Sequence, residues 1–293
     1  MSLGSQLIQF LFTGLSLGSI YALVALGFSM IYSSTGIINL AQGEFVMLGG
    51  LVMVFFTALK VPLYLGFAFT ILVVTAVGVL FERLAIHPLK NVSLITLIMI
   101  TLAASILFRG LAMFIWGKDP YSLPHFSSGR PVQLWGAVLQ LQFFWILAIT
   151  FLAVIGIGIF FNRTITGKAM AACAHNPIAA RLLGIEVDRM ILFSFALSAA
   201  LGALAGAIIT PVTLMEYDRG PLLALKGFAA AVLGGLGSGT GAVIAGFVIG
   251  ILESLGAGLI SSGYKDAIAL LVLLIVLWMK PGGLFGDGGQ TGK

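Results

Sequence analysis

The sequence predicts an all-α polytopic membrane protein from its composition, its apolar stretches and its glycine content. Of the 293 residues, 60% are hydrophobic and 9% are charged, and the mean hydropathy is +1.14. Soluble domains carry about 25% charged residues, so this chain has too few charges to cover a soluble surface. A helix needs about 20 apolar residues to cross a bilayer, and the chain holds many such stretches. Its 38 glycines are typical of membrane helices that approach one another closely.

The apolar stretches predict about eight transmembrane helices, within a range of about eight to ten. The clear spans are 7–31, 43–58, 63–81, 93–116, 141–161, 190–210 and 265–279. The stretch 222–260 is too long for one ordinary helix, and its glycine-rich centre at 234–241 must break a helix. We expect two spans there, the first one short or re-entrant. We expect 1–293 to form a single membrane-spanning domain.

A second break is expected near residues 33–44. The apolar stretch that ends at Ile31 runs into small polar residues, and Asn39, Gln42 and Glu44 follow before the apolar pattern resumes. Polar groups and helix breaks are costly in lipid and are tolerated where they face protein or a water-filled path. These three residues are therefore candidates for a path that carries a polar solute.

Three further ionisable residues lie within the predicted spans. Glu253 lies deep in its apolar stretch, and either a role in the path or a structural role fits it. Lys226 and Arg109 lie nearer the ends of their spans, which favours structural ion pairs or side chains that reach toward the interface. The path candidates are therefore Asn39, Gln42, Glu44 and Glu253.

Basic residues in the short loops predict the orientation. Lys and Arg gather in the loops 82–92 and 162–189 and in the tail, so we place these regions in the cytoplasm. The loop 117–140 has a weaker charge bias, and we place it outside together with 211–221. Alternation then puts the N-terminus outside.

The basic residues are scattered between apolar spans, so the net charge of +5 does not indicate nucleic-acid binding.

The cytoplasmic loop 162–189 predicts a short capped helix. Asn176 is a favourable N-cap, and Pro177 suits the first helical position because the missing N–H has no helical partner there. Gly184 is placed to end the helix after residues 178–183. The expected apolar cluster on this segment is Leu182, Leu183 and Ile185. Two interpretations remain open from shape alone: a helix that lies on lipid, or a docking helix for a cytoplasmic subunit.

No catalytic, metal or nucleotide site is indicated. The three histidines fall in three separate loops, and the chain has one cysteine, Cys173. The run at 237–242 resembles a dinucleotide-binding pattern, but it lies between membrane spans and not after a strand. The tail 286–293 lacks the spacing of a phosphate-binding loop. We therefore expect no enzyme activity and no bound cofactor, and any ATP that drives transport would bind to partner subunits.

The chain resembles the permease subunits of branched-chain amino-acid ABC importers. The resemblance covers nearly the whole chain. It is carried by LGSIYALVALGFSMIYSSTGIINLAQGEFVMLGG (17–50), ERLAIHPLK (82–90), ACAHNPIAARLLGIEVDR (172–189), KGFAAAVLGGLGSGTGAVIAGFVIGILESL (226–255) and YKDAIALLVLLIVLWMKPGGLFG (264–286). Five matches in the same order over most of the length make this resemblance specific.

The resemblance implies an inner-membrane subunit of a prokaryotic importer and a set of partners. The protein partners are a second homologous permease chain, two ATPase subunits and an extracytoplasmic substrate-binding protein. Membrane lipid is a further partner. The family's cytoplasmic coupling region matches 167–188, which favours docking for the capped helix. The resemblance implies that six residues of this helix couple the chain to the ATPase: Asn176, Pro177, Arg181, Leu182, Leu183 and Gly184.

Three other functions remain open. Close relatives of the family carry urea or short amides, so a urea or short-amide ABC permease is the main alternative. A stand-alone secondary transporter or channel would work without an ATPase. A polytopic membrane enzyme finds no support in the residues.

Overall fold

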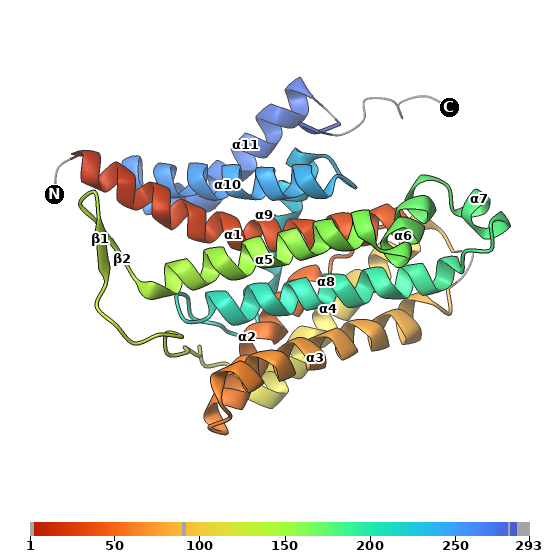
Figure 1. Ribbon diagram of the computed structural model, residues 1–293, viewed down its shortest axis with the longest axis horizontal. Coiled ribbons are helices and arrows are strands. Elements are labelled where there is room, and N and C mark those ends of the chain that lie inside the picture. Colours follow the sequence, from red (N-terminus) through yellow and green to blue (C-terminus); the bar gives the residue numbers. More distant parts are fainter. Residues whose placement is uncertain (1–2, 90–91, 281, 286–293) are drawn as a thin grey trace.

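The computed structural model describes residues 3–89, 92–280 and 282–285. Most of this part of the chain is helical (Figure 1). The elements are α1 (Leu3–Thr35), α2 (Gln42–Ala58), α3 (Leu63–Phe81), η1 (Glu82–Ile86), α4 (Leu94–Trp116), β1 (Val132–Leu134), β2 (Ala137–Leu139), α5 (Leu141–Arg163), α6 (Ile165–His175), α7 (Pro177–Leu182), α8 (Val187–Ile209), α9 (Arg219–Gly234), α10 (Gly239–Leu259), η2 (Ser262–Tyr264) and α11 (Lys265–Met279). The tail 286–293 lies outside the described residues.

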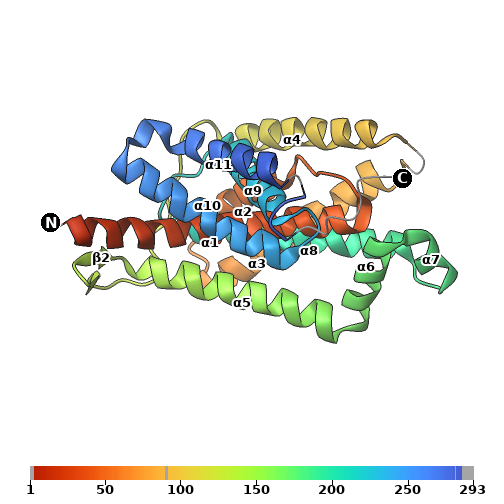
Figure 2. The same cartoon turned by 90° about the horizontal axis from the view of Figure 1, so that it is seen from above.

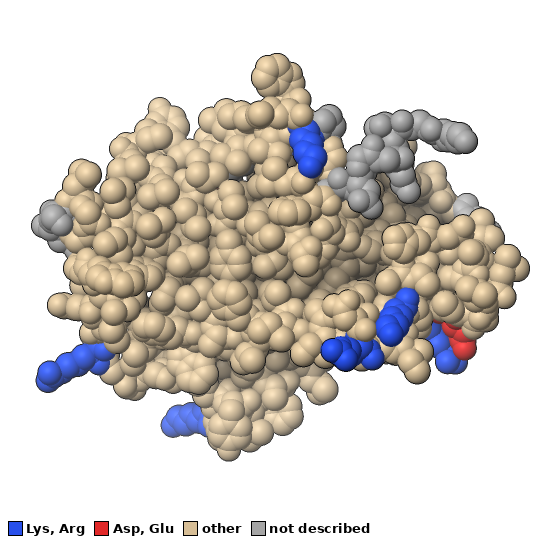
Figure 3. Space-filling view, turned by 45° about the horizontal axis from the view of Figure 1, so that its top comes forward, with Lys and Arg blue, Asp and Glu red and all other residues tan. Residues whose placement is uncertain are grey.

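The prediction of about eight membrane helices is confirmed. Within the described residues, seven helical segments are long and apolar enough to cross a membrane: α1, α3 with η1, α4, α5, α8, α10, and η2 with α11. The shorter apolar helix α2 adds an eighth. The face in Figure 3 is uncharged over its broad middle, and its Lys and Arg side chains lie toward the edges. A surface of this kind suits lipid.

Most of the long helices run roughly parallel to one another, so the molecule has two distinct ends (Figures 1 and 2). The inner end, which we expect in the cytoplasm, carries α6, α7 and η1. The outer end carries the start of α1 and the β1–β2 hairpin. Gln9 of α1 fastens the hairpin, because its side chain donates to the carbonyl of Val138 at 3.2 Å and accepts from the same residue's N–H at 2.8 Å.

Small residues bring α1 and α10 into backbone contact. A Cβ added to Gly250 would lie 2.3 Å from the backbone nitrogen of Gly18, and one added to Gly246 would lie 2.5 Å from that of Ala22. Near the outer end, Ser254 donates to the carbonyl of Phe10 at 2.8 Å. Small residues at these positions therefore let the two helices pack closely, as the glycine content of the chain suggests.

Helix α9 lies across the bundle rather than along it (Figure 1). It has 16 residues and packs against α1, α2, α10 and α11. Its first turn lies beside Glu44 of α2, and its last residue, Gly234, lies against Gly241 of α10. The expected break between α9 and α10 is present, and Gly235 and Gly237 have φ angles of +96° and +91°. The first segment of 222–260 is therefore short, as expected, but it is an internal crossing helix.

The structure corrects two expected loops. Residues Glu82–Ile86 were expected in a loop, but they continue α3 as a π-helical turn. The loop 162–189 holds two helices, because α6 precedes the expected α7. Thr164 starts α6 by accepting a hydrogen bond from the N–H of Gly167 at 2.9 Å. Thr is a favourable N-cap residue, but a single Thr is a weak signal for the start of a helix, so α6 was not predicted.

The outer loop 117–140 contains a β-hairpin that the sequence analysis did not predict. Val132 pairs with Leu139, and Leu134 pairs with Ala137. Both residues of the two-residue turn have positive φ, +48° at Trp135 and +81° at Gly136. This backbone is that of a type I′ turn, for which Asn-Gly is the usual sequence signal. Trp-Gly does not give that signal.

Candidate functional site

Side chains pair with the backbone N–H groups that the break between α1 and α2 leaves without helical partners. The chain turns at Gly36, which has a φ of +69°. The side-chain oxygen of Asn39 accepts from the N–H of Ala41 at 3.1 Å, and Thr101 of α4 accepts from the N–H of Leu40 at 3.1 Å. Backbone groups that would be unpaired inside the bundle therefore have partners. Asn39 is itself 1% exposed.

Gln42 joins three helices inside the bundle. Its side-chain N–H donates to the carbonyl of Ser198 on α8 at 3.2 Å, and its side-chain oxygen lies 2.6 Å from the Ser198 hydroxyl. The same hydroxyl lies 2.9 Å from the carbonyl of Gly27 on α1. Gln42 is fully buried. It therefore fixes the start of α2 against α1 and α8.

Glu44 lies in the middle of the bundle. It is fully buried, and its Oε1 accepts a hydrogen bond from Ser105 at 2.7 Å. Ser105 is the central residue of α4, so this carboxylate lies near mid-depth. Arg109 lies one turn further along α4, with its Nε 3.6 Å from Oε1.

Two helix N-termini meet at this carboxylate. Glu44 is in the first turn of α2, and its Oε2 lies against Gly220 in the first turn of α9. The partial positive charge of helix N-termini favours a negative group at this position. The Oε2 atom itself has no hydrogen-bond partner among the described residues. Glu44 therefore helps to hold α2, α4 and α9 together, while its Oε2 remains an acceptor without a hydrogen bond among the described residues.

Glu253 belongs to a second, separate cluster. Its Oε1 lies 2.8 Å from the Nζ of Lys226, 3.1 Å from the hydroxyl of Tyr21 and 3.4 Å from the Nζ of Lys265. Lys226 also lies 2.7 Å from Asp266 of α11, which is more exposed. The cluster therefore holds two cations and two anions. It joins α1, α9, α10 and α11, which is the structural role that the sequence favoured for Lys226.

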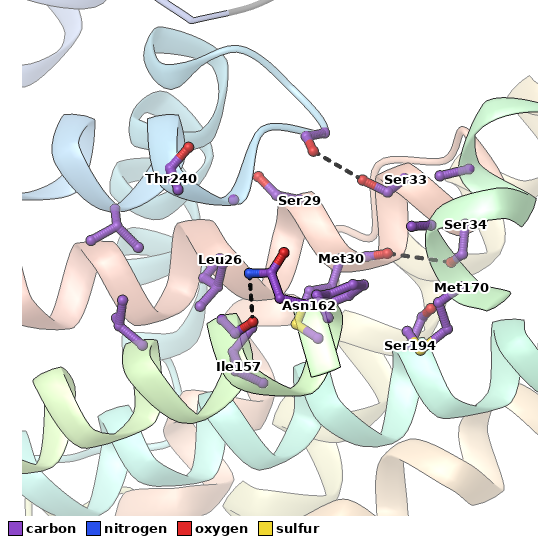
Figure 4. A pocket seen from close by; sticks show the side chains of 18 of the residues that line it. Leu26, Ser29, Met30, Ser33, Ser34, Ile157, Asn162, Met170, Ser194 and Thr240 are labelled. Carbon is purple, nitrogen blue, oxygen red and sulfur yellow. Dashed lines mark hydrogen bonds between the residues drawn. The ribbon is translucent and has the colours of Figure 1, made fainter. Parts of the chain in front are cut away.

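A hollow of about 360 Å³ lies near the inner end. Its walls come from α1, α5, α6, α8 and the start of α10, and its surface is largely apolar. Figure 4 shows Ser29, Ser33 and Asn162 among the side chains that line it. Ser33 donates to the carbonyl of Gly237 at 3.2 Å, whereas the hydroxyl of buried Ser29 has no hydrogen-bond partner among the described residues.

The predicted path residues do not line this hollow. Asn39, Gln42 and Glu44 lie together at the start of α2, and Glu253 lies in the second cluster. The polar lining comes instead from residues that were not among the predicted path candidates: Ser29, Ser33, Ser34, Asn162, His175, Ser194 and Thr240. One signal was available: Ser29 and Ser33 are four residues apart and so share a face of α1.

The capped helix in the inner loop is confirmed as α7. The side chain of Asn176 accepts from the N–H groups of Ile178 and Ala179 at 3.0 Å each, and Pro177 occupies the first turn. Gly184 has a φ of +82°, and its N–H donates to the carbonyl of Arg181. The N–H of the next residue donates to the carbonyl of Ala180, which completes a Schellman motif.

The two faces of this loop differ. Leu182 and Leu183 are 85% and 79% exposed, and Arg181 is also exposed. Ile185 turns inward and packs against the buried cluster beneath α6, so it does not join Leu182 and Leu183 in the expected apolar cluster. Cys173 belongs to that buried cluster, and burial raises the pKa of its thiol, which Arg181 partly offsets. The buried cluster therefore holds the loop against the bundle, and Leu182 and Leu183 are exposed on the outer side of the loop.

The sequence of this chain matches a family model over residues 10–277, and that family is described as the permease component of branched-chain amino-acid transport systems. The chain belongs to this family. It is 33% identical to the high-affinity branched-chain amino-acid transport permease LivH of Escherichia coli strain K12, and the match covers 95% of each chain. It is also 33% identical to the BraD permease of Pseudomonas aeruginosa, again over 95% of each chain.

The permease also shares its fold with a solved structure. This is PsaBC from Streptococcus pneumoniae in complex with Fab, with a TM-score of 0.51 and 17% identity over 93% of this chain and 92% of that one. The family and the apolar helices make this chain a multi-pass inner-membrane permease of the ABC-importer type. As a permease, it is a transport subunit rather than an enzyme.

Proposed function

We propose that this permease brings branched-chain or other small hydrophobic amino acids into the cytoplasm, and that separate subunits bind and hydrolyse the ATP. The observation that carries the proposal is the end-to-end match to branched-chain amino-acid permeases. The geometry adds a capped helix at the inner end with bare leucines on its surface. In this account, the chain itself binds no cofactor.

In the proposed mechanism, α7 transmits the movement of a docked ATPase. Asn176 and Pro177 fix its start, and Gly184 fixes its end, so the helix moves as a rigid unit. Leu182 and Leu183 supply an apolar surface, and Arg181 supplies a positive charge beside it. Exposed apolar patches with polar surroundings are typical of protein contacts. The inward anchoring of α6 would carry the movement to α5 and α8.

The four buried path candidates then shape the path by fixing the helices. Asn39, Gln42 and Glu44 hold the start of α2 against its neighbours, and Glu253 holds α10 against α9. These buried hydrogen bonds make the helix arrangement specific, while Asn39, Glu44 and Glu253 each keep one side-chain atom without a hydrogen-bond partner among the described residues. We assign these residues to the architecture of the path for that reason.

The proposed partners are a second homologous permease chain, two ATPase subunits and an extracytoplasmic substrate-binding protein. The test is to purify the tagged chain from native membranes in mild detergent and to identify what comes with it by mass spectrometry. Cells that carry or lack the chain are then compared for uptake of radiolabelled leucine, urea and acetamide. Recovery of ATPase subunits with leucine uptake supports the proposal. Recovery of the chain alone, or uptake of urea and not leucine, contradicts it.

A further inference from the structure

The hollow lies where the helical bundle meets the coupling loop. Residues 26–34 of α1 and 154–162 of α5 form two of its walls, and α6, which leads directly into α7, forms another. Ser194 of α8 and Thr240 of α10 close it from other sides (Figure 4). A movement of the coupling loop would therefore change this space directly.

Its size suits a small solute. Small-molecule sites are typically about 300–1,000 Å³, and this hollow is about 360 Å³. Side chains such as Leu26, Met30 and Ile157 make most of its surface apolar. An aliphatic body fits such walls without loss of hydrogen bonds.

Among the described residues, the polar lining has no carboxylate, lysine or arginine, and His175 is its titratable member. The hydroxyl of Ser29 is buried at the wall of the hollow and has no hydrogen-bond partner among the described residues, which makes it an unused polar group at this position. A solute with a net charge would find no opposite charge here, which makes its entry costly. A solute without net charge avoids the cost of an unbalanced charge, but the ammonium and carboxylate of an amino acid must still keep hydrogen-bond partners.

Several of the other polar groups already have a hydrogen-bond partner. Ser33 donates to the carbonyl of Gly237, Ser34 to that of Met30, and Asn162 to that of Gly158. The hollow can therefore offer a passing solute few strong bonds. Conduction requires binding that is weak enough for the solute to leave, so this weakness suits a point of release.

We propose that this hollow is the inner-half passage site for the substrate, and that it takes small aliphatic solutes without net charge. The proposal rests on the proposed function, since it takes the solute to be an aliphatic amino acid. It moves the solute contact from the buried start of α2 to the face of α1 that carries Ser29 and Ser33.

Two glycines of α5 provide a matched test. Gly158 lines the hollow, and a Cβ added to it meets no atom within 4 Å. Gly156 is equally unobstructed but does not line the hollow. Gly158→Phe should therefore place a ring in the hollow from a position with room for its Cβ, whereas the ring of Gly156→Phe should lie outside the hollow. Leucine uptake is measured in cells that contain the partner subunits, with the membrane level of each variant measured in parallel.

We expect Gly158→Phe to reduce leucine uptake by at least about tenfold, as the loss of fit in a hydrophobic site can do, and Gly156→Phe to leave it unchanged. Gly158→Ala should reduce leucine uptake less than Gly158→Phe does. Normal leucine uptake by Gly158→Phe would overturn the assignment. Failure of the unaltered chain to take up leucine would instead overturn the proposed function, so the two failures are distinguishable.

A labelling experiment covers the case in which Gly158→Phe does not insert. In a Cys173→Ala background, Ser29→Cys places a single thiol in the hollow. A small methanethiosulfonate reagent is added to the cytoplasmic side of inside-out vesicles that contain the partner subunits. We expect leucine to slow the labelling several-fold and glutamate to have no effect. Equal labelling with and without leucine would overturn the proposal.

Discussion

The carboxylate of Glu44 packs directly against the α-carbon of Gly220. A Cβ added at Gly220 would lie 2.2 Å from Oε2 of Glu44, which is closer than real Cβ contacts come. Ser105 holds the other oxygen of this carboxylate, and Glu44 is fully buried. Only glycine therefore lets α9 begin against α2 in this arrangement. The contact sets the position of the crossing helix.

Gly220→Ala should destabilise the protein for this reason. Overpacking of this kind costs about 1–3 kcal/mol of the free energy of unfolding. Thermal unfolding in detergent measures it as a lower melting temperature. Gly110→Ala on α4 is the control, because its added Cβ meets nothing within 4 Å, and we expect a stability within about 1 kcal/mol of the unaltered chain. Equal melting temperatures for the two variants would contradict the packing.

Lys226→Met should be strongly destabilising. It removes the closest cation from Glu253 and leaves Lys265 at 3.4 Å. Breaking a buried ion pair by removing one partner costs about 3–5 kcal/mol. Adding Glu253→Gln should recover part of the loss, because it removes the buried charge that was left unpaired. Thermal unfolding of the two single variants and the double variant measures this coupling.

The same variants separate the two interpretations of Glu253. If the effects of Lys226→Met and Glu253→Gln on stability were simply additive, the pair would not be the structural unit described above. If the double variant is stable and still takes up leucine, the charge of Glu253 is not needed in the path. Stable protein without uptake would assign it a role there.

Ser198→Ala should loosen the contact between α1, α2 and α8. It leaves the side-chain oxygen of Gln42 without its hydroxyl partner at 2.6 Å. Hydrogen bonds between membrane helices contribute about 1 kcal/mol, so we expect a modest drop in melting temperature. Ser16→Ala is the matched control, since the Ser16 hydroxyl bonds within α1 only, to the carbonyl of Phe12. A larger effect at Ser16 than at Ser198 would argue against the network.

Gly184→Val should impair the end of α7. A β-branched residue adopts a φ of +82° poorly, at a cost of about 1–3 kcal/mol, whereas Asn adopts it more readily. We expect Gly184→Val to lower leucine-stimulated ATP hydrolysis by the assembled importer and Gly184→Asn to lower it less. The amount of chain in the membrane should stay the same. Equal activities would show that the Schellman motif does not matter for coupling.

Arg181→Glu combined with Leu182→Asp should leave the chain in the membrane but prevent ATPase docking. The change reverses a charge and makes polar a leucine that is 85% exposed, so folding should tolerate it. Co-purification of the ATPase subunits measures the effect, and we expect recovery to fall about tenfold or more, as loss of a contact hot spot does. Leu182→Met keeps the apolar surface and should keep docking. Normal docking by the double variant would refute the coupling role of α7.

The sequence predicted the parts of the fold that depend on local pattern. The apolar spans, the breaks around Gly36 and Gly235, and the cap formed by Asn176 and Gly184 all follow from residue types at fixed spacing. The sequence also favoured a structural ion pair for Lys226. These features depend on a few neighbouring residues, and local physical rules therefore suffice.

The rest depends on contacts between distant segments. Helix α9 is turned across the bundle because Gly220 meets Glu44 at one end and Gly234 meets Gly241 at the other. The hollow is lined by residues of five helices that are far apart in the sequence, so no single stretch of sequence predicts it. The hairpin was missed because Trp135 adopts a positive φ that its residue type does not indicate.

The most direct test of the account is leucine transport by the purified assembly in proteoliposomes. The chain is purified with its co-purifying subunits, reconstituted, and supplied with binding protein on one side and ATP on the other. The account predicts leucine accumulation that requires ATP and disappears when the ATPase subunits are omitted. Leucine transport by the chain alone, driven by an ion gradient and indifferent to ATP, would contradict it.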